Sequence, residues 1–124
     1  MSHEIDMGIS DSYPAAADLS GGRYRGVVIN SSGRIAVPAA GARCIGVLQD
    51  KPNGIDVYGK VMIMGVTKME AGAPVAAGAP VTVDNTGRCV AALTTNYVLG
   101  FAKEAAGAAG VFIPVTITHS GNLP

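Results

Sequence analysis

Asn30-Ser31-Ser32-Gly33-Arg34 and Asp84-Asn85-Thr86-Gly87-Arg88 are two turns built to one formula. Each begins with Asn or Asp, has glycine in fourth place and ends in arginine. An Asn or Asp side chain can cap the turn with its own oxygen, and glycine supplies the positive φ that a type I turn with a bulge requires. Each turn joins two short apolar runs, so the two stretches predict two β-hairpins.

Short apolar runs separated by turn residues continue along the chain outside these hairpins. Their Val, Ile, Tyr and Thr content favours strands over short helices. Only Lys103–Ala109 is a helix candidate, limited to a turn or two by Gly107 and Gly110. Pro74 and Pro80 remove ladder donors, which predicts an edge or a crossing loop around them. The sequence therefore predicts one all-β domain with strands at Tyr24–Ile29, Arg34–Val37, Cys44–Gln49, Ile55–Tyr58, Val61–Val66, Val81–Asp84, Cys89–Leu93, Tyr97–Lys103 and Val111–Thr118.

The composition excludes several classes of function. Nine basic residues balance nine acidic ones, and no two basic residues are adjacent, so the clustered positive charge that binds nucleic acid is missing. No apolar run approaches the roughly 20 residues of a membrane span. The acidic start of the chain lacks the pattern of a secretory signal, so we expect assembly in the cytoplasm.

Groups for catalysis, metals or cofactors are few. His3 and His119 lie near the two ends, where an imidazole is hard to fix, and neither has metal ligands at a suitable spacing. Cys44 and Cys89 each lie in an apolar stretch, which favours buried free thiols and leaves a disulfide as the alternative. Lys68, in Thr67-Lys68-Met69-Glu70, resembles the modified lysine of biotinyl carrier domains. A solvated lysine at a strand end is the simpler interpretation, and we expect no enzyme, metal or cofactor.

Residues 1–22 differ from residues 23–124, which we expect to form the β domain. The first 22 residues carry four acidic side chains and no Lys or Arg, which is typical of an extended N-terminal arm. Ile5, Met7 and Ile9 alternate with polar or small residues, the period of a half-buried strand. We expect this arm to add a strand to a sheet edge of a neighbouring subunit or another protein. Its candidate interface residues are Ile5, Met7, Ile9 and Tyr13.

Five segments, in this order and spacing, resemble the capsid cement, or head-decoration, proteins of tailed bacteriophages. The resemblance spans residues 23–118, and each segment is rich in Gly, Ala and Val. The segments are Gly41–Asp50, Val57–Val61, Glu70–Gly78, Val83–Arg88 and Tyr97–Ala102.

The resemblance implies a small β-barrel or β-tulip-like domain that forms homotrimers on the outer face of the mature head. Such proteins bind the major capsid protein and stabilise the contacts between its capsomers. The family offers no catalytic residues to carry over. Two alternatives stay open: another virion β-module, such as a tail or fibre component, and a biotinyl-type carrier domain.

Overall fold

The structure, a computed structural model, describes residues 8–123 and is all-β in this range. The two predicted turns lie between β2 and β3 and between β6 and β7, as expected. The strands are β1 (Ile9–Pro14), β2 (Gly26–Ile29), β3 (Ile35–Ala36), β4 (Gly46–Leu48), β5 (Tyr58–Glu70), β6 (Pro80–Val83), β7 (Cys89–Ala91), β8 (Tyr97–Ala102) and β9 (Phe112–Asn122).

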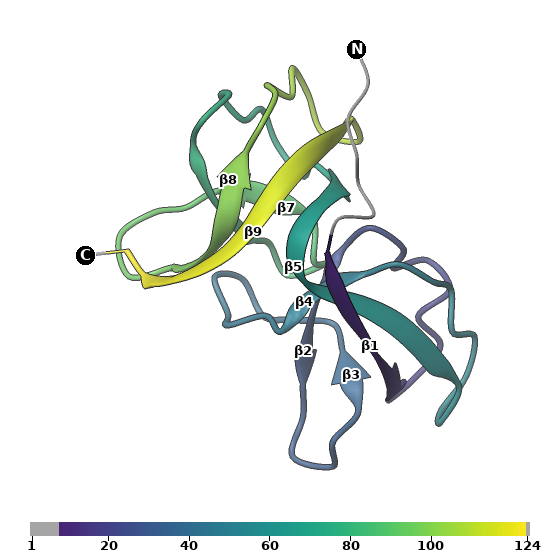
Figure 1. Cartoon of the computed structure of the whole chain (residues 1–124). Coiled ribbons are helices and arrows are strands. Elements are labelled where there is room, and N and C mark those ends of the chain that lie inside the picture. The colour runs from purple at the N-terminus through teal and green to yellow at the C-terminus, as the bar shows by residue number, and fades with distance from the viewer. Residues whose placement is uncertain (1–7, 124) are drawn as a thin grey trace.

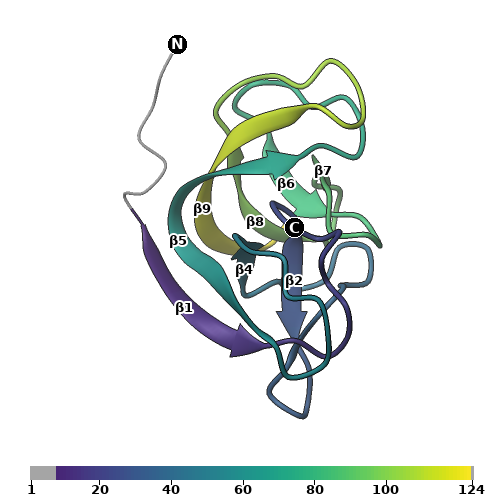
Figure 2. The same ribbon diagram turned by 90° about the vertical axis from the view of Figure 1, so that its right-hand side faces the viewer.

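The strands form one curled antiparallel sheet (Figure 1). Its order is β3-β2-β4-β5-β9-β8-β6-β7, and β1 pairs with β5 beside this path. The sheet curls like half a barrel around the strongly bent β5 (Figure 2). The all-β prediction is confirmed. Among the described strands, β3 and β7 end the path without pairing with each other, so the hydrogen-bonded path does not close into a ring.

The same pattern of strand pairing occurs twice in the sheet. We call residues 9–64 the N-terminal half and residues 65–118 the C-terminal half. Adding 54 to the residue numbers of β2, β4 and the first part of β5 gives β6, β8 and β9. In β1 the shift is 56, so β1 corresponds to the second part of β5. The register pairs Gly26↔Val47, Val27↔Gly46, Leu48↔Val61 and Tyr13↔Gly59 thus correspond to Pro80↔Phe101, Val81↔Gly100, Ala102↔Val115 and Met69↔Ile113.

The two turns show the repetition in atomic detail. Asn30 Oδ1 accepts hydrogen bonds from the backbone N–H groups of Ser32 and Arg34, both at 3.0 Å. Asp84 Oδ1 accepts them from Thr86 at 2.9 Å and Arg88 at 3.0 Å. The fourth residues, Gly33 and Gly87, have φ angles of 79° and 88°. The sequence prediction for both turns is confirmed, with the side-chain caps and the positive φ where the formula places them.

Gly46 and Gly100 occupy equivalent places in β4 and β8. A Cβ at Gly46 would collide with the carbonyl oxygen of Met62, and one at Gly100 with that of Thr116. Each colliding oxygen belongs to the neighbouring strand of the same half, β5 or β9. Both glycines therefore allow two strands to approach more closely than a side chain would permit.

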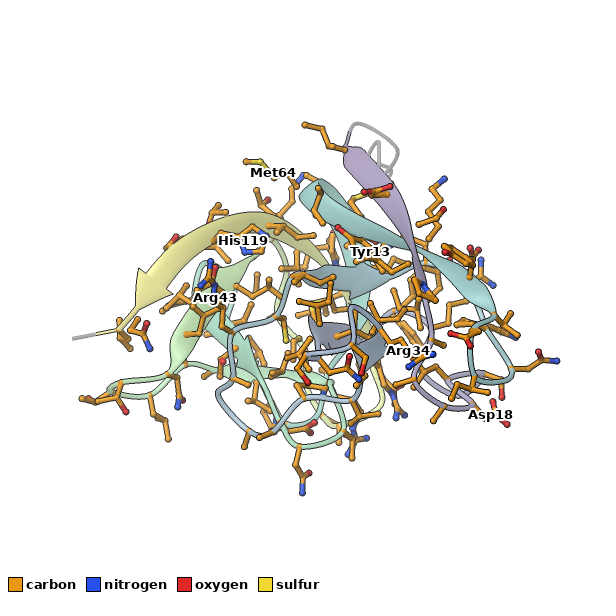
Figure 3. The ribbon with its side chains drawn as sticks, turned by 90° about the horizontal axis from the view of Figure 1, so that it is seen from below. Tyr13, Asp18, Arg34, Arg43, Met64 and His119 are labelled. Atoms are coloured by element: carbon orange, nitrogen blue, oxygen red, sulfur yellow. The ribbon has the colours of Figure 1, made fainter. Side chains whose placement is uncertain are left out.

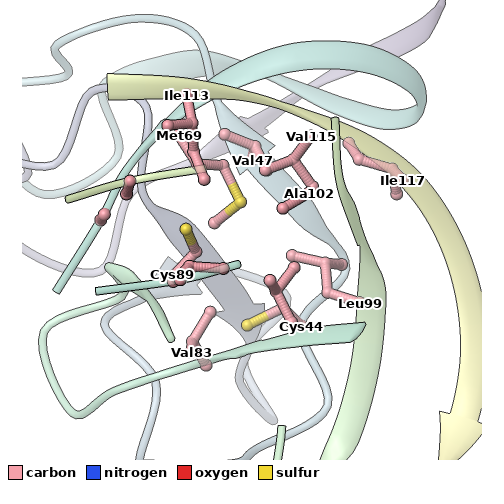
Figure 4. Packing of buried hydrophobic residues seen from close by; sticks show 14 of the residues in the cluster. Cys44, Val47, Met69, Val83, Cys89, Leu99, Ala102, Ile113, Val115 and Ile117 are labelled. Carbon is pink, nitrogen blue, oxygen red and sulfur yellow. The ribbon is translucent and has the colours of Figure 1, made fainter. Parts of the chain in front are cut away.

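Two groups of buried side chains fill the curl of the sheet. The smaller group belongs to the N-terminal half: Ala15, Leu19, Val27, Ile35, Leu48 and Val61. Their six counterparts in the C-terminal half all lie in the larger group: Ala71, Val75, Val81, Cys89, Ala102 and Val115. The larger group also contains three residues of the N-terminal half, Cys44, Val47 and Met62, so that core spans the junction between the halves; Figure 4 shows Cys44 and Val47 in it.

Several predicted elements differ from the observed ones. Lys103–Ala109 forms bends and an isolated bridge at Ala106 rather than a helix, because Gly107 within it and Gly110 just after it, at a φ of 88°, favour turns over helix. Ile55–Tyr58 is not a separate strand, since β5 begins at Tyr58 and runs without a break to Glu70. The stretch around Pro74 is a loop that crosses the fold, as expected, and Pro80 then opens β6.

Part of the expected N-terminal arm lies within the sheet. Ile9–Pro14 forms β1, which pairs with β5 of its own chain rather than with another chain. Ala15 and Leu19, just behind it, are buried at 0% and 6% exposure. They take the places that Ala71 and Val75 take in the C-terminal half. Of the predicted alternation of Ile5, Met7 and Ile9, only Ile9 lies among the described residues, where it begins β1. Pairing of the arm with another chain stays a prediction. Residues 1–7, with Ile5 and Met7, lie outside the described residues.

Candidate contact surfaces

A hollow opens where β5 and β9 separate. Their last register pair is Gly65↔Ile117; beyond it β9 follows β8, while β5 turns to pair with β1 and β4. The hollow has a volume of about 480 Å³ and is lined mainly by carbon. Figure 3 shows Arg43, Met64 and His119 around it. Its lining residues are Arg43, Cys44, Ile45, Ile63, Met64, Tyr97 and His119.

His119 holds the two diverging strands together. Its Nε2 lies 2.7 Å from the carbonyl oxygen of Ile63, and its Nδ1 lies 2.8 Å from the hydroxyl of Tyr97. A neutral ring with the proton on Nε2 satisfies both contacts, because Nε2 then donates to the carbonyl and Nδ1 accepts from the hydroxyl. Ile63 is the extra residue at the β1–β5 register shift, so its carbonyl has no partner in β1. The expectation that His119 would be poorly fixed is therefore wrong.

Both cysteines are buried free thiols, and Cys44 forms part of the wall of the hollow. Burial raises the pKa of the Cys44 thiol to about 12. Burial, with a smaller contribution from the nearby Asp84 carboxylate, raises that of Cys89 to about 12. A thiol with so high a pKa is almost entirely protonated at neutral pH and is a poor nucleophile. The prediction of buried thiols is confirmed.

The described residues contain no group of side chains typical of a metal centre. No three His, Cys, Asp or Glu side chains among them are placed to hold a metal ion. Lys68 lies inside β5, paired with Pro114, and its Nζ stands 4.8 Å from the centre of the Tyr24 ring. A modified lysine in a carrier domain needs an exposed hairpin tip, which this position does not offer. Nor does any helix within residues 8–123 have the length and apolarity to span a bilayer.

One charged cluster joins the two halves. The Glu70 carboxylate accepts a hydrogen bond from Arg25 Nε at 3.1 Å, and its second oxygen lies 3.6 Å from Arg88 Nη1. Burial alone would raise the pKa of Asp84 beside it, but the hydrogen bonds from Thr86 and Arg88 outweigh that effect and lower the pKa. In the N-terminal half the corresponding Arg34 instead pairs with Asp56 at 2.7 Å in an exposed position. The hydrogen bond from Arg34 lowers the pKa of Asp56.

Large apolar side chains are exposed at equivalent places in the two halves. Val57 and Tyr58 are 40% and 65% exposed, and their counterparts Val111 and Phe112 are 41% and 49% exposed. We define the Tyr58 patch as Ile55, Val57 and Tyr58, and the Phe112 patch as Val111 and Phe112. Tyr58 begins β5, and Phe112 pairs with Glu70 at its other end. The two patches therefore lie at opposite ends of one strand, and the Phe112 ring also has an edge contact with the Tyr24 ring, with the ring centres 6.0 Å apart.

Of the four residues predicted as an interface, the structure describes Ile9 and Tyr13. Ile9 is 60% exposed beside Met64, its register partner, which is 48% exposed. Tyr13 is half-buried against the core of the N-terminal half. Ile5 and Met7 fall outside the described residues, and so does His3. The hollow was not predicted, because its lining comes from four separate segments that no local pattern connects.

Comparison with known proteins gives two findings. The sequence matches the protein family described as phage cement protein over residues 5–117. The fold is similar to the crystal structure of the head fibre gp8.5 N base in bacteriophage phi29, with a TM-score of 0.74 and 20% sequence identity. That similarity covers 95% of this chain and 99% of the other. No match was found among curated proteins.

Proposed function

This chain belongs to the phage cement protein family, a family of structural proteins of the phage head, and we propose that it is a capsid decoration protein. In this role it binds the outer face of the mature head, contacts the major capsid protein and stabilises the contacts between capsomers. The family match over residues 5–117 carries the proposal. The chain would act in the virion after assembly in the host cytoplasm.

The exposed apolar patches support this role. A protein with balanced charge has little long-range attraction for a partner, so binding must come largely from apolar contact. The Tyr58 patch and the Phe112 patch supply such surface at both ends of β5. We assign these patches to contacts with two neighbouring capsomers, one patch to each capsomer.

We further propose a homotrimer. Closed threefold symmetry buries one interface three times and multiplies weak contacts with the head through high effective concentration. Light scattering should give a mass three times that of the 12.5 kDa chain. A monomeric mass, both free in solution and after release from heads, would refute the trimer while leaving head binding to be tested on its own.

A second candidate function rests on the structural comparison. The similar solved structure is the N base of a head fibre, and the alignment covers nearly the whole of both chains. A chain with this fold can therefore serve as the base on which a fibre stands. Both candidates place the protein on the head, and they differ in whether a further fibre domain is attached.

Co-sedimentation with purified particles tests the proposal. The protein should saturate mature heads and bind procapsids and tails weakly, because a protein that bridges capsomers recognises the spacing of the expanded lattice. Tyr58→Asp and Phe112→Asp should each lower occupancy, since each places a charge in an apolar contact. Leu93→Asp is the matched control, an equally drastic change at a side chain 70% exposed elsewhere. Equal binding to mature heads and procapsids would refute the bridging role.

A further inference from the structure

Backbone hydrogen bonds outside the strand ladders join the two halves of the molecule. Among the described residues there are four of them, two with the donor in each half. They seat the β6–β7 hairpin on the N-terminal half, and we call this contact the internal junction. The N–H groups and the carbonyl oxygens that accept from them are Gly26 to Gly87 at 2.7 Å, Gly41 to Val83 at 2.8 Å, Glu70 to Tyr24 at 3.0 Å and Tyr97 to Gly41 at 3.1 Å.

The β2–β3 hairpin is the counterpart of the hairpin that makes the internal junction, and it projects from the fold (Figure 1). Ile29 on it is 44% exposed, whereas Val83, at the equivalent place, is 1% exposed. On a second copy of the chain, the free hairpin would find a C-terminal half to sit on, as the β6–β7 hairpin sits on the N-terminal half. Such a head-to-tail contact leaves a free hairpin on each added copy, so it can continue into a ring or a filament.

Proline replaces two of the donors that this repeated contact would need. Pro80 stands at the place of Gly26, and Pro14 stands at the place of Glu70. Proline has no backbone N–H, so neither residue can donate to a second copy. The two carbonyl oxygens that would face these prolines would lose water without gaining a donor, which disfavours the contact.

The end of β9 occupies the groups that remain. Gly41 both donates and accepts at the internal junction, and its counterpart is Thr95, with the same φ of 72°. The Thr95 N–H donates to the Leu123 carbonyl oxygen at 2.7 Å, and the Thr95 carbonyl oxygen accepts from Asn122 Nδ2 at 2.9 Å. Both backbone groups that a second copy would use are therefore engaged within the chain.

We propose that Pro14, Pro80 and the pair Asn122 and Leu123 block the two faces that would meet if a second copy repeated the internal junction. The fold thereby contains the same unit twice without adding further units from other copies. The proposal concerns contacts between copies of this chain and does not rest on head binding. It requires the proposed homotrimer to form through another surface.

Restoring the missing groups tests the proposal. Pro14→Glu and Pro80→Gly introduce the residues that stand at the equivalent places of the internal junction, and Asn122→Asp sets a carboxylate against the Thr95 carbonyl oxygen. At about 1 mM, the triple variant should have a weight-average mass about twice that of the parent protein or more. Pro80→Gly with Asn122→Asp, which leaves β1 unchanged, should associate more weakly. Analytical ultracentrifugation measures the masses, and circular dichroism verifies each fold.

A further substitution in the triple variant identifies the surface that associates. Ile29→Asp should restore the parent's mass, because Ile29 takes the buried place of Val83 in the repeated contact. Val37→Asp is the matched control on the same hairpin, since Val37 is 53% exposed and its counterpart Ala91 stays exposed beside the internal junction. Folded double and triple variants that keep the parent's mass would overturn the proposal. Association that survives Ile29→Asp would overturn it too, because it would use another surface.

Discussion

The two halves of the molecule share one ladder but use their hairpins differently. In the C-terminal half, the β6–β7 turn packs on the N-terminal half: Gly26 N–H donates to the Gly87 carbonyl at 2.7 Å. Val83 is 1% exposed at this junction, whereas its counterpart Ile29 is 44% exposed on the β2–β3 hairpin. The same supersecondary unit thus serves once as an internal contact and once as a projecting element. Repetition of a backbone does not imply repetition of its burial, so the halves should respond differently to equivalent substitutions.

The largest loss of stability should come from substitutions at Gly46 and Gly100, which occupy equivalent places in the two halves. Gly46→Ala and Gly100→Ala each place a Cβ against a carbonyl oxygen of the adjacent strand, which is backbone and cannot move aside cheaply. Each should lower the free energy of unfolding by about 3 kcal/mol or more. Chemical denaturation of both variants measures it. If one substitution is tolerated and the other is not, the halves are less equivalent in packing than their registers indicate.

The second comparison should separate the halves. Gly33→Ala and Gly87→Ala both force alanine into positive φ, at a cost of about 1–2 kcal/mol. At Gly33 an added Cβ meets nothing within 4 Å, whereas at Gly87 it stands 2.5 Å from the Gly26 carbonyl oxygen. Gly87→Ala should therefore cost about twice as much as Gly33→Ala. Equal melting temperatures for the two variants would show that the β6–β7 turn is not seated on Gly26 in solution.

The smallest effect concerns the caps of the two turns. Asp84→Ala should cost about 2 kcal/mol and Asn30→Ala about 1 kcal/mol, because the hydrogen bonds lost at Asp84 involve a charged acceptor. The pKa of Asp84 is lowered in the fold from its ordinary 3.8, so its contribution is present above that pH and is lost as the pH falls through the lowered value. Asn30 does not titrate.

Thermal melts at neutral and acid pH measure this difference. The stability gap between the parent protein and Asp84→Ala should narrow in acid, while the gap for Asn30→Ala stays constant. The Asn30 variant thus controls for the general loss of stability at low pH. A gap for Asp84→Ala that is independent of pH would mean that the carboxylate charge contributes nothing to the turn.

Local turn chemistry was enough to predict both hairpins. Relations between residues far apart in the sequence could not be predicted from it. Both hairpins followed from five-residue formulas, since an Asx cap and a positive-φ glycine act within the turn. The full repeat was not visible, because its paired core positions hold different residues: Ile35 matches Cys89 and Leu48 matches Ala102. Gly59 and Lys60 separated the predicted runs Ile55–Tyr58 and Val61–Val66, although Tyr58–Glu70 is one strand in the sheet.

The candidate surfaces were harder still to predict. Exposure of Tyr58 or Phe112 depends on which strands cover them, and the hollow arises from the separation of two strands that meet only in the folded sheet. His119 looked unconstrained by its place near the end of the chain, yet it is held by Ile63 and Tyr97 from two other strands. A position near the end of the chain therefore does not by itself mean that a side chain is unconstrained, because β9 brings His119 back into the sheet.

β5 has a mechanical consequence. Its 13 residues carry the Tyr58 patch at one end and pair with the Phe112 patch at the other, over a contour of roughly 40 Å at about 3.3 Å per residue. A pull between the two patches is transmitted through this bent strand (Figure 2), so the hydrogen bonds that join β5 to β1, β4 and β9 carry part of the load in shear. No loop interrupts this path from Tyr58 to Glu70. The strand can therefore resist a force that pulls the Tyr58 patch and the Phe112 patch apart.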